Sequence, residues 1–149
     1  MENIFEPAVS AAILQRLEKL PPGAPAQWGK MTVAQMLAHC QRPLQVALGE
    51  KELKQSLIGF LFGKMAKKQL LKDTPFKKNL PTDASFIVKD EPNFEHEKQL
   101  LQSLILRFGS ANKVLLAQKK HPFFGYMTAE EWGRLVWKHM DHHLLQFGA

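Results

Sequence analysis

The stretch that decides the fold is the last long helix, Trp132-Gly-Arg-Leu-Val-Trp-Lys-His-Met-Asp-His-His-Leu-Leu-Gln-Phe147. At about 100° per residue, its apolar side chains gather within about 60° of Trp132, namely Leu135, Val136 and Phe147. The polar residues Arg134, Lys138 and Asp141 fall on the opposite side. His139 and His143 lie at about −20° and +20°, in the middle of the apolar stripe. Since that stripe has to be covered by other helices, both imidazoles are expected to be buried.

A buried imidazole needs a partner, because an unmatched polar group in the core is costly. His139 and His143 are one helical turn apart, so a single metal ion can satisfy both. A pair of hydrogen-bonded core histidines is the alternative. His142 lies at the edge of the stripe and could replace His143 as a ligand. Residue 140 is methionine, so the His-Glu-x-x-His motif of metalloproteases is absent.

Two histidines are too few for a stable zinc site, and His39 is the best third candidate by position. It borders the apolar arc of a helix predicted over 33–48. Cys40 points about 100° away on that helix and is expected to pack in the core. His121 precedes a proline in a turn-rich loop over 121–127, and His96 lies in the first turn of another helix beside two glutamates. Both are weaker candidates.

The periodicity of the apolar residues predicts an all-α fold. Helices are expected at about 7–20, 33–48, 94–107 and from 129 onward, and Pro43 is expected to kink the second of them. Thr32 with Gln35, and Thr128 with Glu131, form capping boxes. The apolar side of the helix over 94–107 is assigned to Leu100, Leu101, Leu104 and Phe108. Residues 50–92 are predicted to form a long crossover that contains a shorter helix at about 54–71. The segment over 111–118 is left open between helix and loop.

There is little alternating pattern, and the only strand candidate, Ser85-Phe-Ile-Val88, is too short to build a sheet. Together, these elements predict a four-helix bundle in one domain over residues 1–149.

The composition narrows the function classes. The net charge of +6 comes with no nucleic-acid-binding motif, which argues against a nucleic-acid partner. The single cysteine excludes an internal disulfide, and no run is apolar for the roughly 20 residues that a membrane span requires. No signal peptide is visible. We therefore expect a cytoplasmic protein that binds a small-molecule substrate and has no membrane partner.

Two segments together resemble the DinB-like/YfiT-like metalloprotein superfamily. The first is Trp28 followed by Met31-Thr-Val-Ala-Gln-Met-Leu-Ala-His39, and the second is His139-x-x-His142-His143. The segments His121-Pro-Phe-Phe-Gly, Thr128-x-Glu-Glu-Trp132 and Lys138-His-Met-Asp-His-His143 are similar to a branch described as a domain of unknown function. The resemblance covers nearly the whole chain and is weakest over 50–92.

The resemblance implies a bundle with an up-down-down-up course. It also implies one divalent metal, often nickel or zinc, held by His39, His139 and His143. Several members of the superfamily are thiol-dependent transferases or isomerases that use a low-molecular-weight thiol such as bacillithiol or mycothiol, and many form homodimers. We therefore expect a metal-dependent thiol S-transferase that acts on a small electrophile. The alternatives are a non-catalytic metal- or small-ligand-binding bundle, and a bundle without metal that serves as an interaction module.

Overall fold

The structure is a computed structural model that describes residues 2–53, 57–82 and 84–149. The described residues form six α-helices, one 3-10 helix and a two-stranded hairpin. The helices are α1 (Pro7–Lys19), α2 (Val33–Ala47), α3 (Leu57–Leu70), α4 (Phe94–Gly109), α5 (Lys113–Ala117) and α6 (Ala129–Gln146). The 3-10 helix is η1 (Ala84–Phe86), and the strands are β1 (Lys120–His121) and β2 (Gly125–Tyr126). The all-α prediction is confirmed at this level.

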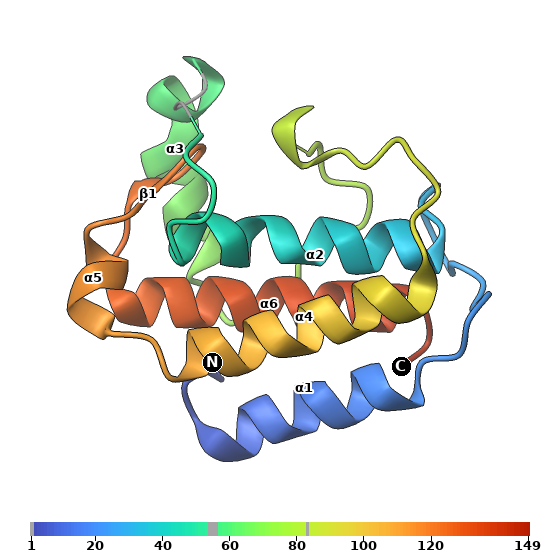
Figure 1. The fold of residues 1–149 in the computed structure, drawn as a ribbon. Helices are drawn as coiled ribbons and strands as arrows, with labels where there is room; N and C mark the ends of the chain where they lie inside the picture. Colours follow the sequence, from blue (N-terminus) through green and yellow to red (C-terminus); the bar gives the residue numbers. More distant parts are fainter. Residues whose placement is uncertain (1, 54–56, 83) are drawn as a thin grey trace.

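The four long helices α1, α2, α4 and α6 lie side by side (Figure 1). Helix α2 contacts α4 and α6, and α1 contacts the same two helices from the other side. Their apolar faces meet in one core, whose fully buried members include Ile13, Leu17, Leu37, Leu44, Leu101, Ile105, Phe108, Trp132, Met140 and Leu144. This packing brings α2 and α6, which are distant in sequence, into direct contact.

The ends of the helices follow the local signals in the sequence. In α2, Thr32 Oγ1 accepts a hydrogen bond from the Gln35 amide, and the Gln35 side chain accepts one from the Thr32 amide. Thr128 and Glu131 make the same reciprocal pair at the start of α6. These bonds satisfy amides that a helix start leaves without partners. Helix α2 continues through Pro43 to Ala47.

Several expectations for the less regular parts were wrong or incomplete. The strand candidate at 85–88 is not a strand, because Ala84–Phe86 forms η1. Part of the loop over 121–127 is the hairpin, in which His121 pairs with Gly125. The segment left open over 111–118 contains the short helix α5. The start of the helix predicted at 54 falls on residues outside the described ranges, and α3 is described from Leu57.

Two side chains differ from the prediction in their burial. Leu100 is 40% exposed, and Ile105 takes its place on the buried side of α4. Lys138 was assigned to the polar face of α6 but is buried, and its Nζ donates to the backbone carbonyls of Leu70 and Lys72 at 2.8 Å each. A buried ammonium is tolerated there because carbonyl oxygens satisfy it.

Helix α3 packs on the hairpin through its glycines. A Cβ atom placed on Gly59 would lie 2.7 Å from Phe123 Cα, and one placed on Gly63 would overlap the Phe123 carbonyl oxygen. This close approach leaves no room for a side chain, so glycine at both positions fixes how α3 is turned. Within the described ranges, no helix is long and apolar enough to cross a membrane.

Candidate metal centre

Three histidines from two helices meet between α2 and α6. His39 lies on α2, and His139 and His143 lie one turn apart on α6. Each offers a ligand atom within 4.8 Å of the other two. The Nε2 atoms of His39 and His139 are 3.0 Å apart, and the His143 ring lies 4.8 Å from the ring of His39 and 4.6 Å from that of His139. The structure therefore brings together the three residues that the sequence singled out.

The outer side of two rings is held by hydrogen bonds. His39 Nδ1 lies 3.0 Å from the carbonyl oxygen of Phe86, and His143 Nδ1 lies 2.8 Å from Gln146 Oε1. The Gln146 amide is oriented in turn, because its Nε2 donates to the Trp28 carbonyl at 2.6 Å. Since a carbonyl oxygen only accepts, both Nδ1 atoms carry the proton in this network. The lone pairs of His39 and His143 are therefore on Nε2.

His139 is the least satisfied ring of the three. Its Nδ1 is buried and has no hydrogen-bond partner among the described residues. If His139 Nε2 donates to His39 Nε2, as in a simple histidine pair, the Nδ1 lone pair is left buried and unmatched. An unmatched buried polar atom is costly, and His139 Nδ1 stays unmatched whether Nε2 donates to His39 or binds an ion.

The three imidazoles are held in their neutral form. Burial lowers the pKa of His39, and it lowers that of His139 further with help from the neighbouring histidines. Burial and the nearby His39 lower the pKa of His143 to about 3. A histidine ligates a metal through the lone pair of the neutral ring. At neutral pH, no proton therefore has to be removed before these rings can bind an ion.

The spacing of the nitrogens fits one metal ion. Two nitrogen ligands at the usual zinc distance of about 2.0–2.1 Å lie about 2.9–3.4 Å apart at angles between 90° and tetrahedral. The 3.0 Å separation of the two Nε2 atoms falls inside that range. Hydrogen bonds from Nδ1 to a carbonyl or amide oxygen are also the usual outer support of a ligating histidine. The residues thus fit a divalent metal with three protein ligands.

The remaining histidines lie outside this cluster of ligand atoms. His142 is half-buried, and its ring lies 5.5 Å from that of Trp28 and 5.7 Å from that of Phe76. His121 is buried in the hairpin, where its Nδ1 accepts from the amides of Phe123 and Phe124. This is the turn role that the sequence indicated. His96 is exposed in the first turn of α4.

Cys40 is fully buried, as expected for a core residue. Its thiol lies 3.7 Å from the sulfur of Met36. Burial raises the pKa of the Cys40 thiol, which keeps it protonated and unreactive. Cys40 is also absent from the group of residues whose ligand atoms converge.

Sequence reasoning missed the groups that orient the ligands. Gln146 could have been found, because it lies three residues after His143 and so on the same side of the helix. Phe86 had no comparable signal, since its contribution is a backbone carbonyl brought in by a distant segment. Its ring packs edge-on against His39 at 6.5 Å. The crossover therefore helps to build the candidate metal centre.

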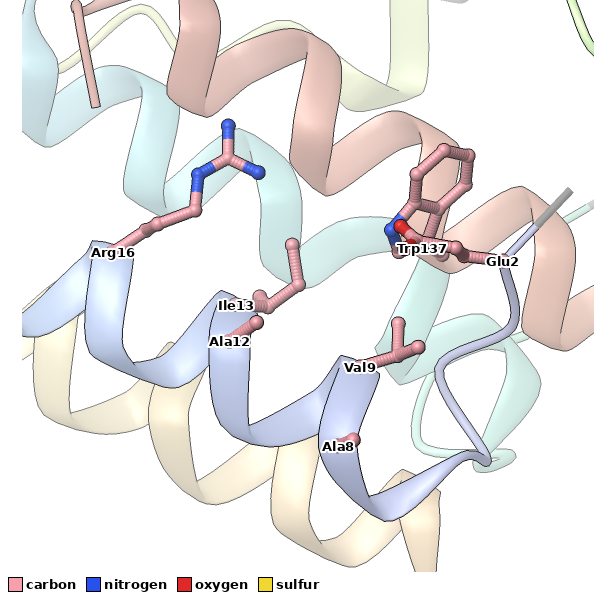
Figure 2. Close-up of a pocket in the computed structure, with 7 residues that line it drawn as sticks. All are labelled: Glu2, Ala8, Val9, Ala12, Ile13, Arg16 and Trp137. Atoms are coloured by element: carbon pink, nitrogen blue, oxygen red, sulfur yellow. The ribbon is translucent and has the colours of Figure 1, made fainter.

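A surface groove of about 170 Å³ lies between α1 and α6 (Figure 2). It is lined by Glu2, Ala8, Val9, Ala12, Ile13, Arg16 and Trp137. The Arg16 guanidinium is already engaged, because it donates to Asp141 at 2.7 Å and to the Ala149 oxygen at 3.0 Å. None of the three clustered histidines lines this groove, and the candidate metal centre is separate from it.

A family model described as "Protein of unknown function (DUF1569)" matches residues 7–149. The chain therefore belongs to this family. No curated protein and no solved structure matches it.

Proposed function

We propose that this member of the DUF1569 family is a DinB-like metalloprotein, with one four-helix-bundle domain and one divalent ion, nickel or zinc, held by His39, His139 and His143. The ring of contacts among α1, α4, α2 and α6 supports the bundle. The observation that carries the metal proposal is the direction of the lone pairs. The hydrogen bonds to the Phe86 carbonyl and to Gln146 leave the Nε2 atoms of His39 and His143 unprotonated. The Nε2 atom of His139 lies 3.0 Å from that of His39.

The proposed activity is a thiol-dependent S-transfer to a small electrophile. When bound, a divalent ion with three histidine ligands keeps a position open, where it lowers the pKa of a bound thiol so that the thiolate acts as nucleophile. The protein's own part is to hold three neutral rings in place. The Phe86 carbonyl and the Gln146 amide keep the Nδ1 protons of His39 and His143 where they are. His139 is partly exposed as a residue, whereas His39 and His143 are buried.

Metal analysis of untagged protein tests the site. We expect close to one equivalent of nickel or zinc in the wild type and less than about a tenth in the His39→Ala/His143→Ala double variant, because a single remaining histidine holds zinc weakly. The exposed His96→Ala variant is the matched control and should keep its metal. His142→Ala should also keep it, and loss of the metal in this variant would identify His142 as a ligand in place of His143. A wild type with as little metal as the double variant would leave the bundle as an interaction module.

Thiol conjugation separates the enzyme from a binding protein. Metal-loaded wild type is assayed with monochlorobimane and a panel of low-molecular-weight thiols, alongside metal-stripped protein. The proposal expects a faster rate with at least one thiol, lost on stripping and restored by adding the metal back. If the protein binds about one equivalent of metal but conjugates none of the thiols faster than metal-stripped protein, it is the non-catalytic metal- or ligand-binding bundle.

A further inference from the structure

Helix α3 exposes an unusual amount of apolar surface. Five large side chains on this one helix are more than half exposed: Leu57 at 76%, Phe60 at 72%, Leu61 at 63%, Phe62 at 51% and Met65 at 67%. Single exposed apolar residues are common, but a contiguous group of this size marks a contact surface. Here they adjoin one another along about two turns of helix.

The packing of α3 keeps this face turned outward. Its other side is the glycine face that lies against the Phe123 backbone. Lys67 adds a tether, since its Nζ donates to the Tyr126 carbonyl at 3.0 Å and to the Glu131 carboxylate at 3.2 Å. Figure 1 shows α3 standing away from the group of α1, α2, α4 and α6, beside the hairpin. Rotating α3 to bury the apolar side chains would break both sets of contacts.

The charge around this face has one sign. No aspartate or glutamate occurs between Glu52 and Asp73, and the whole chain carries +6. Lys64, Lys68 and Lys72 are all exposed, and Lys64 and Lys68 lie within about 20° of Leu57 around the helix, on the apolar side. Any occupant of the face therefore has to accept large apolar side chains and supply negative charge between them.

These requirements favour a lipid surface over a protein. A second copy of the chain would bring the same lysines against each other, with no acidic residue on α3 to offset them. A bilayer needs no matching shape: its acyl region takes up phenylalanine and leucine side chains, and lysines extend to anionic headgroups.

We infer that α3 is an interfacial anchor that lies on the surface of an anionic phospholipid membrane. Its 14 residues are too few to span a bilayer, which takes about 20, so the helix lies flat on the surface with its apolar side chains inserted. The expectation of no membrane partner rested on the absence of a spanning segment, which does not address this mode of binding. The inference is independent of the metal centre.

Vesicle co-sedimentation of the full chain tests the anchor. Wild-type protein should sediment with vesicles of phosphatidylcholine that contain about 30% phosphatidylserine, bind pure phosphatidylcholine vesicles less, and dissociate as salt rises. The Phe60→Glu/Leu61→Glu variant should partition about tenfold or more weakly, because both insertions are lost. Leu106→Glu/Val114→Glu is the control, since these residues are 59% and 68% exposed on α4 and α5 and change the net charge equally. It should bind within about twofold of the wild type, because neither side chain lies on α3.

A second variant pair isolates the charge. Lys64→Gln/Lys68→Gln should weaken binding to the anionic vesicles more than Lys77→Gln/Lys89→Gln, in which two exposed lysines outside α3 are changed. Absence of wild-type binding to either kind of vesicle overturns the inference, as does equal loss in both glutamate variants. A dimer in light scattering that Phe60→Glu/Leu61→Glu dissociates also overturns it, because the face is then an interface between two copies.

Discussion

At the scale of single residues, the outer hydrogen bonds of His39 and His143 select the nitrogen of each ring that faces the cluster. Gln146 determines this for His143, and its own orientation is fixed by the Trp28 carbonyl. His142, next in sequence, has aromatic neighbours in Trp28 and Phe76 instead. Adjacent histidines on one helix therefore have different surroundings, and only one of them shares the space with His39 and His139.

Replacing Gln146 tests this support without touching a ligand. In Gln146→Leu, His143 Nδ1 loses its acceptor, and the ring is no longer held in one tautomer. Such outer-shell losses typically weaken metal affinity by about 10–100-fold. We expect a weakening of this size for zinc, measured by competition with a chelator of known affinity.

The control for that experiment is Gln102→Leu on α4. Gln102 Nε2 donates to the Glu18 carboxylate at 2.9 Å, and α4 carries none of the three clustered histidines. This variant should bind zinc as the wild type does. Equal affinity in all three proteins would show that Gln146 plays no part in holding the metal.

At the scale of elements, α2 and α6 are held in place by different interactions from those that hold α3. Capping boxes set the starts of α2 and α6, and an apolar stripe docks each of them. Among the side chains of α3 that the structure describes, Leu70 reaches the core at the end of the helix, and the middle of the helix is held by the close approach of Gly59 and Gly63 to the hairpin. Its attachment is therefore sensitive to a single methyl group.

The variant Gly63→Ala should loosen α3. The added Cβ meets the Phe123 carbonyl oxygen, which is backbone and cannot move aside easily. Overpacking of this kind costs about 1–3 kcal/mol, of which alanine's helix propensity offsets about 1 kcal/mol, so hydrogen exchange over residues 57–70 should speed up by up to about thirtyfold.

Gly109→Ala provides the matched control, because a Cβ there meets nothing within 4 Å. Gly109 is the last residue of α4, so alanine gains less helix propensity there than at Gly63, and the control tests for an effect of the added methyl group without a clash. Unchanged exchange over 57–70 in Gly63→Ala would mean that the glycine contact does not hold α3 in place.

At the scale of the whole molecule, the fold brings three neutral histidines to one buried place, and this links stability to pH. The unfolded chain takes up a proton on His143 near pH 6.5, whereas the folded protein resists protonation down to about pH 3. Between these values the unfolded state binds more protons, so stability falls as the pH drops below 6.5. The lowered pKa values of His39 and His139 act in the same direction.

In metal-free protein, the lowered pKa of His143 should by itself reduce the free energy of unfolding by about 2 kcal/mol between pH 7 and pH 5. This follows because pH 5 is about 1.5 units below the ordinary histidine pKa, and each unit corresponds to about 1.36 kcal/mol. Urea unfolding at pH 7 and 5 measures it. His143→Gln should reduce the pH dependence, and His96→Gln, which changes an exposed side chain, should not. Stability that rises on acidification, or an identical slope in His143→Gln, would contradict the pKa assignment.

Much of the helical structure and the pairing of two histidines on the last helix could be predicted because the signals are short-range. The starts at Thr32 and Thr128 depend on groups three residues away, and the pairing of His139 with His143 depends on one helical turn. The third histidine, His39, was found because only one position on the second helix combined an imidazole with the edge of an apolar arc. The strand candidate at 85–88, judged too short to build a sheet, contains part of a 3-10 helix, because a few β-branched and aromatic residues carry little local information.

By itself, the sequence determined where the main helices begin and which histidines share a face, since both follow from contacts within four residues. Only the tertiary structure decided what those side chains meet. The Phe86 carbonyl reaches His39 from 47 residues away in the sequence. The Leu70 and Lys72 carbonyls cover Lys138, although periodicity alone places Lys138 on the polar face of α6. Backbone acceptors carry no sequence signal, because every residue type has one. Their positions follow from how the crossover packs over α2 and α6.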